Sequence, residues 1–199
     1  MQTREERQRA MTECLSDHIE QMFHDRARET MEYFHLNRES VLQSFLSAIT
    51  VASGAIRPLI DLGKKQKIKF LQFSFLFSGA LMNERRLKID FYDAGYYGDL
   101  AEAGGFWDYS MLFPYVDDDI EMLRNKLTGQ MRRVMEYELI DLRMVYHVGV
   151  FAIMEEILTL ISADEAFANA LTEIYEPKVL VIYGAYLSQS KLITTVTAR

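Results

Sequence analysis

The chain has 199 residues, of which 49 % are hydrophobic and 26 % charged, and its formal net charge at pH 7 is −7. This length and composition predict one soluble globular domain, residues 1–199, with a core of its own. The acidic balance excludes generic nucleic-acid binding, because phosphate groups repel a negative surface. A single cysteine, Cys14, excludes an internal disulfide.

The N-terminal sequence MQTREERQRA has no apolar stretch after its charges, so it does not resemble a secretory signal. The longest apolar runs, around residues 70–82 and 144–154, are shorter than the roughly 20 residues that cross a bilayer. We therefore expect a cytoplasmic protein that has no membrane partner.

Residues 1–63 predict a pair of helices. Thr3 followed three residues later by Glu6 is a capping-box pattern that opens the first helix, and apolar residues recur at helical spacing to about Leu36. A second helical stripe follows, and Pro58 should end or kink it because proline removes a helix hydrogen bond. The short connection between the two helices predicts antiparallel neighbours.

From Ile68 the hydrophobic period changes, and residues 64–93 predict a β-hairpin. Apolar side chains alternate with polar ones along two runs, Leu71, Phe73, Phe75 and Phe77, then Leu87, Ile89 and Phe91. The first run also fits a helical stripe, but its aromatic enrichment and the matching second run favour strands. Because a lone hairpin is marginal in water, its apolar face must pack on the helices, on another strand or on a protein partner.

Residues 89–123 form an acidic, aromatic segment. It holds nine Asp or Glu residues, nine aromatic residues and no Lys or Arg, so its charge of −9 leaves +2 for the rest of the chain. Within it, residues 94–116 predict a structured loop, because four glycines there permit tight turns.

Residues 117–190 predict the C-terminal helices. Asp117–Asp119 suit a helix N-terminus, and the nearly all-apolar stretch from Leu139 to Met154 predicts an enclosed central helix, continuous to Ile161 or broken near Gly149. Ser162 with Glu165 is a second capping-box pattern, and Pro177 suits the first turn of a last helix, although the sequence VLVIY alone would also fit a strand. The tail TTVTAR would allow a short strand. The expected fold class is thus α+β, with about five helices packed on a central β-hairpin.

Five residues are candidates for binding a ligand or partner: Tyr96, Tyr97, Trp107, Asp108 and His147. Tyr and Trp are frequent in binding hot spots, and we expect those in the acidic segment to be exposed. Carboxylates near aromatic rings would suit a small cationic ligand or a protein partner. His147 lies in the most apolar predicted helix, where it needs a partner for its ring nitrogens: an acidic one would raise its pKa, whereas a carbonyl or Tyr hydroxyl would make it structural.

No catalytic or cofactor motif is complete. Glu32 and His35 have the Glu-x-x-His spacing of di-iron helix bundles, but no second such pair occurs, so they are weak metal candidates and no metal or other cofactor is expected. The leading functional hypothesis is a non-catalytic binding, regulatory or protein-interaction module, with a homodimer through the hairpin or the aromatic segment as one form. The alternative is a small metal-dependent hydrolase that uses His147, Glu32 or His35 with nearby carboxylates.

Overall fold

The computed structural model describes residues 3–82, 84–131 and 133–198, apart from the side chain of Asp17. Within these residues the chain is α+β and combines helices with a mixed five-stranded sheet. The helices are α1 (Arg4–Leu36), α2 (Arg38–Ser53), α3 (Ile56–Asp61), α4 (Phe77–Met82), α5 (Val116–Gln130), α6 (Glu136–Ser162) and α7 (Glu165–Ala170), with short 3-10 turns at Tyr96–Gly98 and Ser110–Leu112. The strands are β1 (Ile68–Phe75), β2 (Arg86–Tyr92), β3 (Gly104–Asp108), β4 (Tyr175–Ala185) and β5 (Ser190–Thr197).

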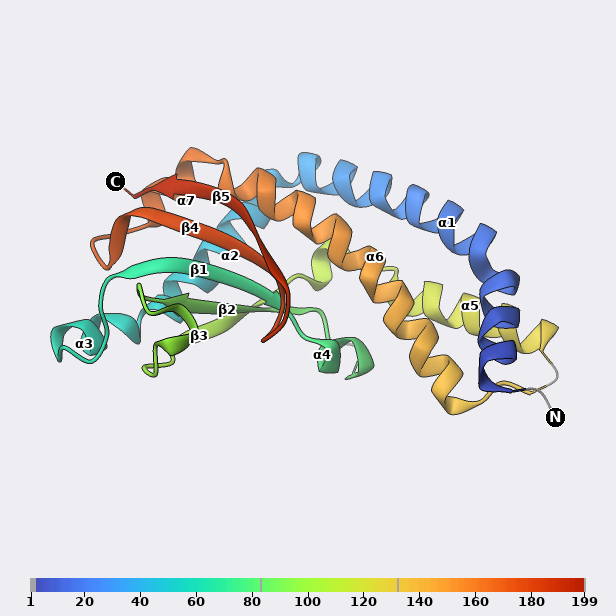
Figure 1. The fold of residues 1–199 in the computed structure, drawn as a ribbon. Coiled ribbons are helices and arrows are strands. Elements are labelled where there is room, and N and C mark those ends of the chain that lie inside the picture. Colours follow the sequence, from blue (N-terminus) through green and yellow to red (C-terminus); the bar gives the residue numbers. More distant parts are fainter. Residues whose placement is uncertain (1–2, 83, 132, 199) are drawn as a thin grey trace.

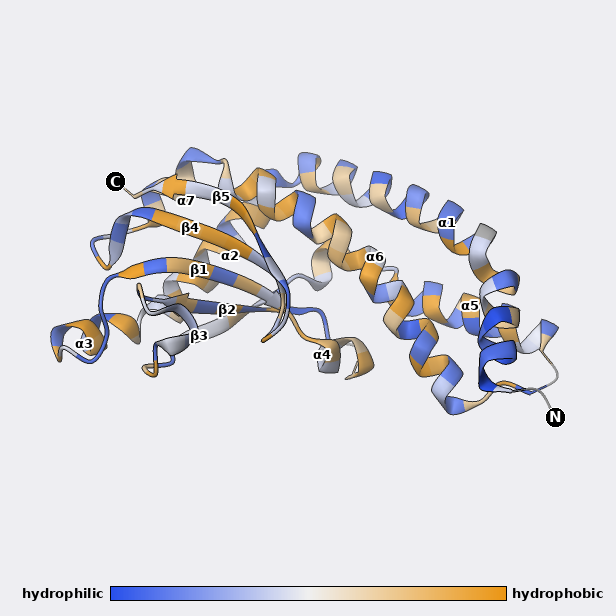
Figure 2. Ribbon diagram, in the orientation of Figure 1, coloured by the Kyte–Doolittle hydropathy of each residue, from blue (hydrophilic) through white to orange (hydrophobic). Residues whose placement is uncertain are grey.

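The molecule is elongated, with the sheet at one end and the long helices α1 and α6 running away from it to the end where α5 lies (Figure 1). In Figure 2 the start of α1 is mostly hydrophilic, whereas α6 and β4 carry long apolar stretches. Helices α2, α6 and α7 cover one face of the sheet: Phe45 of α2 contacts Phe73 and Phe167, and Phe151 of α6 stacks on Phe75 at 3.9 Å between ring centroids.

The N-terminal helices form where the sequence predicts them. The capping box at Thr3 is confirmed, because its hydroxyl accepts from the Glu6 amide at 3.2 Å while the Glu6 carboxylate accepts from the Thr3 amide at 2.8 Å. Helix α1 then runs to Leu36. Pro58 lies in the first turn of α3, where its missing N–H leaves no helix hydrogen bond unmade.

The predicted hairpin is confirmed as the antiparallel pair β1 and β2, in which Phe73 is opposite Ile89. It is not the whole sheet, because β3 pairs with β2 and β4 pairs with β1, giving the order β3-β2-β1-β4-β5. The expected loop at 94–116 therefore contains a strand, and the connection between β1 and β2 contains α4. Strands β3 and β4 thus cover both edges of the hairpin, and the helices cover its apolar face.

Two predictions for the C-terminal region are wrong. The last helix expected from Pro177 is strand β4, because its β-branched residues enter a buried parallel pairing with β1 that no local pattern reveals. Ser162 ends α6, and Asp164 caps α7 instead by accepting from the Ala166 amide at 2.9 Å.

For the central helix, the structure selects the continuous one of the two predicted alternatives. Helix α6 is unbroken at Gly149. A Cβ there would lie 2.2 Å from the Phe23 ring, so the glycine lets α1 pack closely.

Asp119 connects three helices in the interior. Its carboxylate accepts from Arg26 of α1 at 2.7 and 2.9 Å and from the Tyr146 hydroxyl of α6 at 2.6 Å, and its side chain is 2 % exposed. A buried carboxylate with these partners is expensive to disturb, because removing its charge leaves the guanidinium without its counter-ion.

We expect Asp119→Asn to lower the free energy of unfolding by about 3 kcal/mol, measured by urea denaturation. The matched control is Asp118→Asn, which changes an exposed neighbour in the same helical turn and should stay within about 0.5 kcal/mol of the unaltered protein. Equal effects of the two substitutions would show that this ion pair does not hold the helices together.

Candidate functional site

Strand β3 has one hydrogen-bonding edge that no strand covers in the described part of the chain. The Phe91 amide donates to the Ala103 carbonyl and the Tyr109 amide donates to the Arg85 carbonyl. These two bonds show which residues of the antiparallel pair direct their backbone groups toward each other, because such residues alternate along each strand. Gly105 and Trp107 therefore direct their backbone groups toward β2. By the same alternation, the N–H and C=O groups of Gly104, Phe106 and Asp108 point away from the sheet.

Helix α2 lies beneath β3 at unusually close range. Ser44, Ala48 and Ala52 follow one another at four-residue spacing and lie along the strand. A Cβ on Gly105 would lie 2.7 Å from the Cβ of Ala52, so only glycine fits there. The Trp107 indole donates to the Ser44 hydroxyl at 3.2 Å and packs edge-on against a ring of α2. Small residues on both elements thus bring the helix against the sheet edge.

A groove of about 610 Å³ opens between α2 and β3. Its walls come from the two elements and from the turn after β3, and Asp108 is the charged residue among those that line it. A second depression of about 540 Å³ runs along the outer side of α2, and Ser47 and Val51 border both. The groove therefore follows the free edge of the strand and offers mainly small and apolar surface.

The outer side of α2 is exposed and uncharged from Gln43 to Val51, and depletion of charged residues is typical of the centre of an interaction surface. No charged residue occurs from Ser40 to Ile56, and Val51 is 78 % exposed. Among the residues that the structure describes, two helical stretches are apolar enough to cross a membrane by length and composition alone, Arg38–Asp61 and Glu136–Ser162. The second is a core helix with half of its apolar window buried, whereas only 28 % of the first is buried.

The opposite edge of the sheet is less suited to pairing. In strand β5, Thr194 pairs with Val181 but Leu192 pairs with Ile182, so Ile193 is an extra residue that makes a β-bulge. A bulge bends and twists an edge strand and discourages further pairing. Strand β3 keeps a continuous register with β2 along all five residues. Of the two edges, β3 is the one with regular geometry.

Two of the predicted binding residues, Trp107 and Asp108, line this groove. The expected exposure of Trp107 is wrong: it is 1 % exposed, because its ring fills the space between the sheet and α2. Asp108 is exposed and accepts from the Ser110 amide at 2.9 Å. Although partial burial opposes its charge, the hydrogen bonds with Ser110 hold the pKa of Asp108 below its ordinary value. Sequence reasoning predicted the helix α2 but missed its part in this surface, for which its run without charged residues was the available signal.

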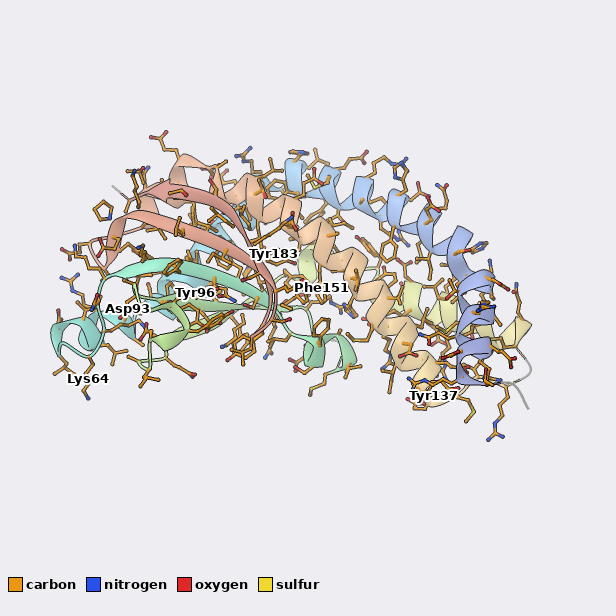
Figure 3. The ribbon with its side chains drawn as sticks, viewed as in Figure 1. Lys64, Asp93, Tyr96, Tyr137, Phe151 and Tyr183 are labelled. Atoms are coloured by element: carbon orange, nitrogen blue, oxygen red, sulfur yellow. The ribbon has the colours of Figure 1, made fainter. Side chains whose placement is uncertain are left out.

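Tyr96, labelled in Figure 3, and Tyr97 lie elsewhere, and both bond Gln72 on the sheet face that the helices leave open. The Tyr96 hydroxyl donates to the side-chain oxygen Oε1 of Gln72 at 2.7 Å, and the side-chain nitrogen Nε2 of Gln72 donates to the Tyr97 hydroxyl at 3.2 Å. The two rings lie 4.2 Å apart between centroids. Tyr96 holds a φ of +50°, which is strained for an aromatic residue. These side chains serve first to cover the buried Gln72.

The remaining candidates do not converge on one place. Glu32 and His35 are exposed on α1, and the described residues contain no group of three or more His, Cys, Asp or Glu that could hold a metal ion. His147 is fully buried in α6, and neither ring nitrogen has a hydrogen-bond partner there. A hydrogen-bond partner was expected for this imidazole, either an acidic residue of the segment 89–123 or a carbonyl or Tyr hydroxyl. Among the residues that the structure describes, none of these is bonded to His147.

No family model, curated protein or solved structure matches this chain. Its function is therefore argued from the geometry of its own surface.

The unpartnered imidazole of His147 makes the fold sensitive to acid. Burial is the main cause that lowers the pKa of His147 to about 4; the cationic Arg85 and Arg143 act in the same sense and Asp117 in the opposite one. The imidazole of the unfolded chain takes up its proton near pH 6.5. The neutral His147 therefore makes its full contribution to the free energy of unfolding above that pH, and this contribution is lost as the pH falls toward 4. Such a difference corresponds to about 3 kcal/mol of unfolding free energy.

We expect His147→Leu to remove most of this acid dependence. Urea denaturation between about pH 7 and pH 4 should show a smaller loss of unfolding free energy in the variant than in the unaltered protein. His35→Leu, on the exposed surface of α1, serves as the matched control and should leave the dependence unchanged. An unaltered pH profile in the His147 variant would show that this imidazole is not kept neutral in the fold.

Proposed function

We propose that the chain is a non-catalytic protein-interaction module that binds a polypeptide strand along the free edge of β3. One observation carries the proposal: a regular, unpaired strand edge lies beside a groove and an exposed helix face without charges. Strand addition uses such an edge, since main-chain hydrogen bonds supply affinity and flanking pockets supply specificity.

The groove has room for the side chains of an added strand. In an extended segment, alternate side chains point to opposite sides. Those facing α2 would enter the groove, where Ser44, Ser47 and Ala48 leave space for small or apolar groups. Those on the other side would lie beside Phe106, which is 52 % exposed.

The other functions considered from the sequence have less support. A hydrolase needs its acid, base or metal ligands within reach of one substrate, but His147 is enclosed while Glu32 and His35 lie exposed on another helix. A small cationic ligand would have Asp108 as its counter-ion in the groove, yet Arg86 and Arg85 already act on that carboxylate. Neither arrangement matches the extended shape of the strand edge.

We expect Phe106→Pro to weaken strand binding without unfolding the protein. Proline at position 106 removes only an N–H that points away from the sheet, so the hydrogen bonds between β3 and β2 remain. The bound strand loses the donor for one of its carbonyl groups, which is then left unpaired. That loss corresponds to about 1–3 kcal/mol, or roughly 5- to 150-fold in affinity. The measurement is the affinity of peptides selected on the unaltered protein from an unbiased displayed library.

Phe106→Thr is the matched control, because it also removes the ring but keeps the N–H. It should retain most of the affinity, and circular dichroism should show both variants folded. Selected peptides that bind the proline and threonine variants equally well, or a library that yields no peptide at all, would contradict strand addition at this edge.

A further inference from the structure

Three buried nitrogen atoms of two residues, Arg85 and His147, have no hydrogen-bond partner among the described residues. They are Nη1 of the Arg85 guanidinium and both ring nitrogens of the His147 imidazole. Most buried polar atoms in proteins are hydrogen-bonded, so each exception calls for an explanation. Arg85 directly precedes β2 and His147 lies in the middle of α6. Because the charge of Arg85 acts on the imidazole, the three atoms belong to one place in the fold.

The groups around this imidazole carry an excess of positive charge. Arg143 lies four residues before His147 on α6 and therefore on the same side of the helix, and its side chain pairs with no carboxylate in the part of the chain that the structure describes. From the first turn of α5, Asp117 also acts on the imidazole, and it accepts from Nη2 of Arg85 at 3.1 Å. Tyr109, on which the charge of Arg85 also acts, stays neutral because burial raises its pKa. Two guanidinium groups against one carboxylate leave a charge of +1 beside the neutral imidazole.

We propose that Arg85, Arg143 and His147 form a binding site for a small inorganic oxyanion with two negative charges, phosphate or sulfate. Guanidinium N–H groups bond the oxygen atoms of such anions strongly. A neutral imidazole has one donor and one acceptor, whereas a protonated imidazole has two donors. His147 therefore takes up one proton from the solvent when the anion binds, and the imidazolium and the excess guanidinium charge together balance the dianion. This site does not depend on strand binding at β3.

The ion pair between Arg85 and Asp117 lies between this site and the solvent. The Asp117 side chain is 51 % exposed and that of Arg85 is 15 % exposed, whereas Nη1 of Arg85 is buried. The guanidinium thus extends from the surface toward the interior. An anion that reaches His147 competes with the Asp117 carboxylate for the same cation. Removing this carboxylate should therefore strengthen anion binding, although it removes an ion pair from the fold.

Isothermal titration calorimetry with sulfate, at constant ionic strength in chloride buffer, tests the role of His147. Sulfate remains a dianion between about pH 7.5 and pH 5.5, the range in which histidine commonly titrates, so a change in affinity reports on the protein. The affinity for sulfate should rise as the pH falls, by up to about tenfold per pH unit, which is the limit for uptake of one proton. His147→Gln should remove this rise. An affinity of the unaltered protein that does not change with pH would overturn the proposal.

The same titration of arginine variants tests the donors. Arg85→Gln and Arg143→Gln should each weaken sulfate binding at least about tenfold, because each removes hydrogen bonds from a charged group. Arg124→Gln is the matched control, since Arg124 is exposed on α5 and pairs with Glu121, and it should bind sulfate as the unaltered protein does. Circular dichroism checks that the variants are folded, and Arg143→Gln keeps the test available if Arg85→Gln does not fold. Equal affinities of the Arg143 and Arg124 variants would overturn the proposal.

Aspartate variants give a result of opposite sign. Asp117→Asn should strengthen sulfate binding several-fold, whereas Asp118→Asn, which removes the same charge from an exposed neighbour in the same turn, should change it little. Inorganic phosphate should bind as sulfate does. Free phosphoserine should bind more weakly, because the fully buried His147 leaves no room for a larger molecule. No saturable sulfate binding, equal effects of the two aspartate variants, or phosphoserine binding as tight as that of phosphate would overturn the proposal.

Discussion

The contact between Gly105 and Ala52 is the constraint on which the candidate site depends. Because glycine lacks a Cβ, the backbone of β3 approaches α2 closely, and the sheet edge and the helix become one surface. The Trp107 side chain then fills the layer between them and bonds Ser44. This packing uses the small-residue side of α2, so its other side, with Val51, is left at the surface. The exposure of an apolar helix is thus a consequence of how β3 is held.

Several carboxylates and rings of the acidic segment form internal contacts that stabilise the fold. Asp99 and Lys65 form a buried ion pair, with side chains 2 % and 0 % exposed, at the start of the turn that leads to β3. Asp119 joins α5 to α1 and α6. In the middle of α6, the carbonyl of Phe151 accepts from the Tyr183 hydroxyl of β4 at 2.8 Å, where the sheet meets the helices (Figure 3). Carboxylates and rings that suggested a cationic ligand are therefore largely committed to internal contacts.

Local signals in the sequence predicted local structure. The capping box at Thr3 and the paired alternation around Phe73 and Ile89 are complete within short stretches, and both are confirmed. Strand β4 was not predicted because its partner β1 is about 100 residues away, and Pro177 with apolar neighbours is compatible with either structure locally. The α+β class and the hairpin could thus be predicted, whereas the order of five strands could not.

The candidate site was predicted only in part, for a related reason. Trp107 and Asp108 were singled out by residue type, but the surface they belong to exists only once α2 packs under β3. Tyr96 carried the same signal as Trp107 and lies instead on the open sheet face, bonded to Gln72. Residue type identifies side chains able to bind; tertiary packing decides which of them share a surface.

Amide hydrogen exchange, resolved by residue and followed with and without a selected peptide, tests the central claim most directly. The amides of Gly105 and Trp107 face β2 and should exchange slowly under both conditions. If a strand adds to the edge, the amides of Phe106 and Asp108 should exchange rapidly in the free protein and become protected when the peptide binds. Equal exchange of these two amides with and without bound peptide would contradict the account.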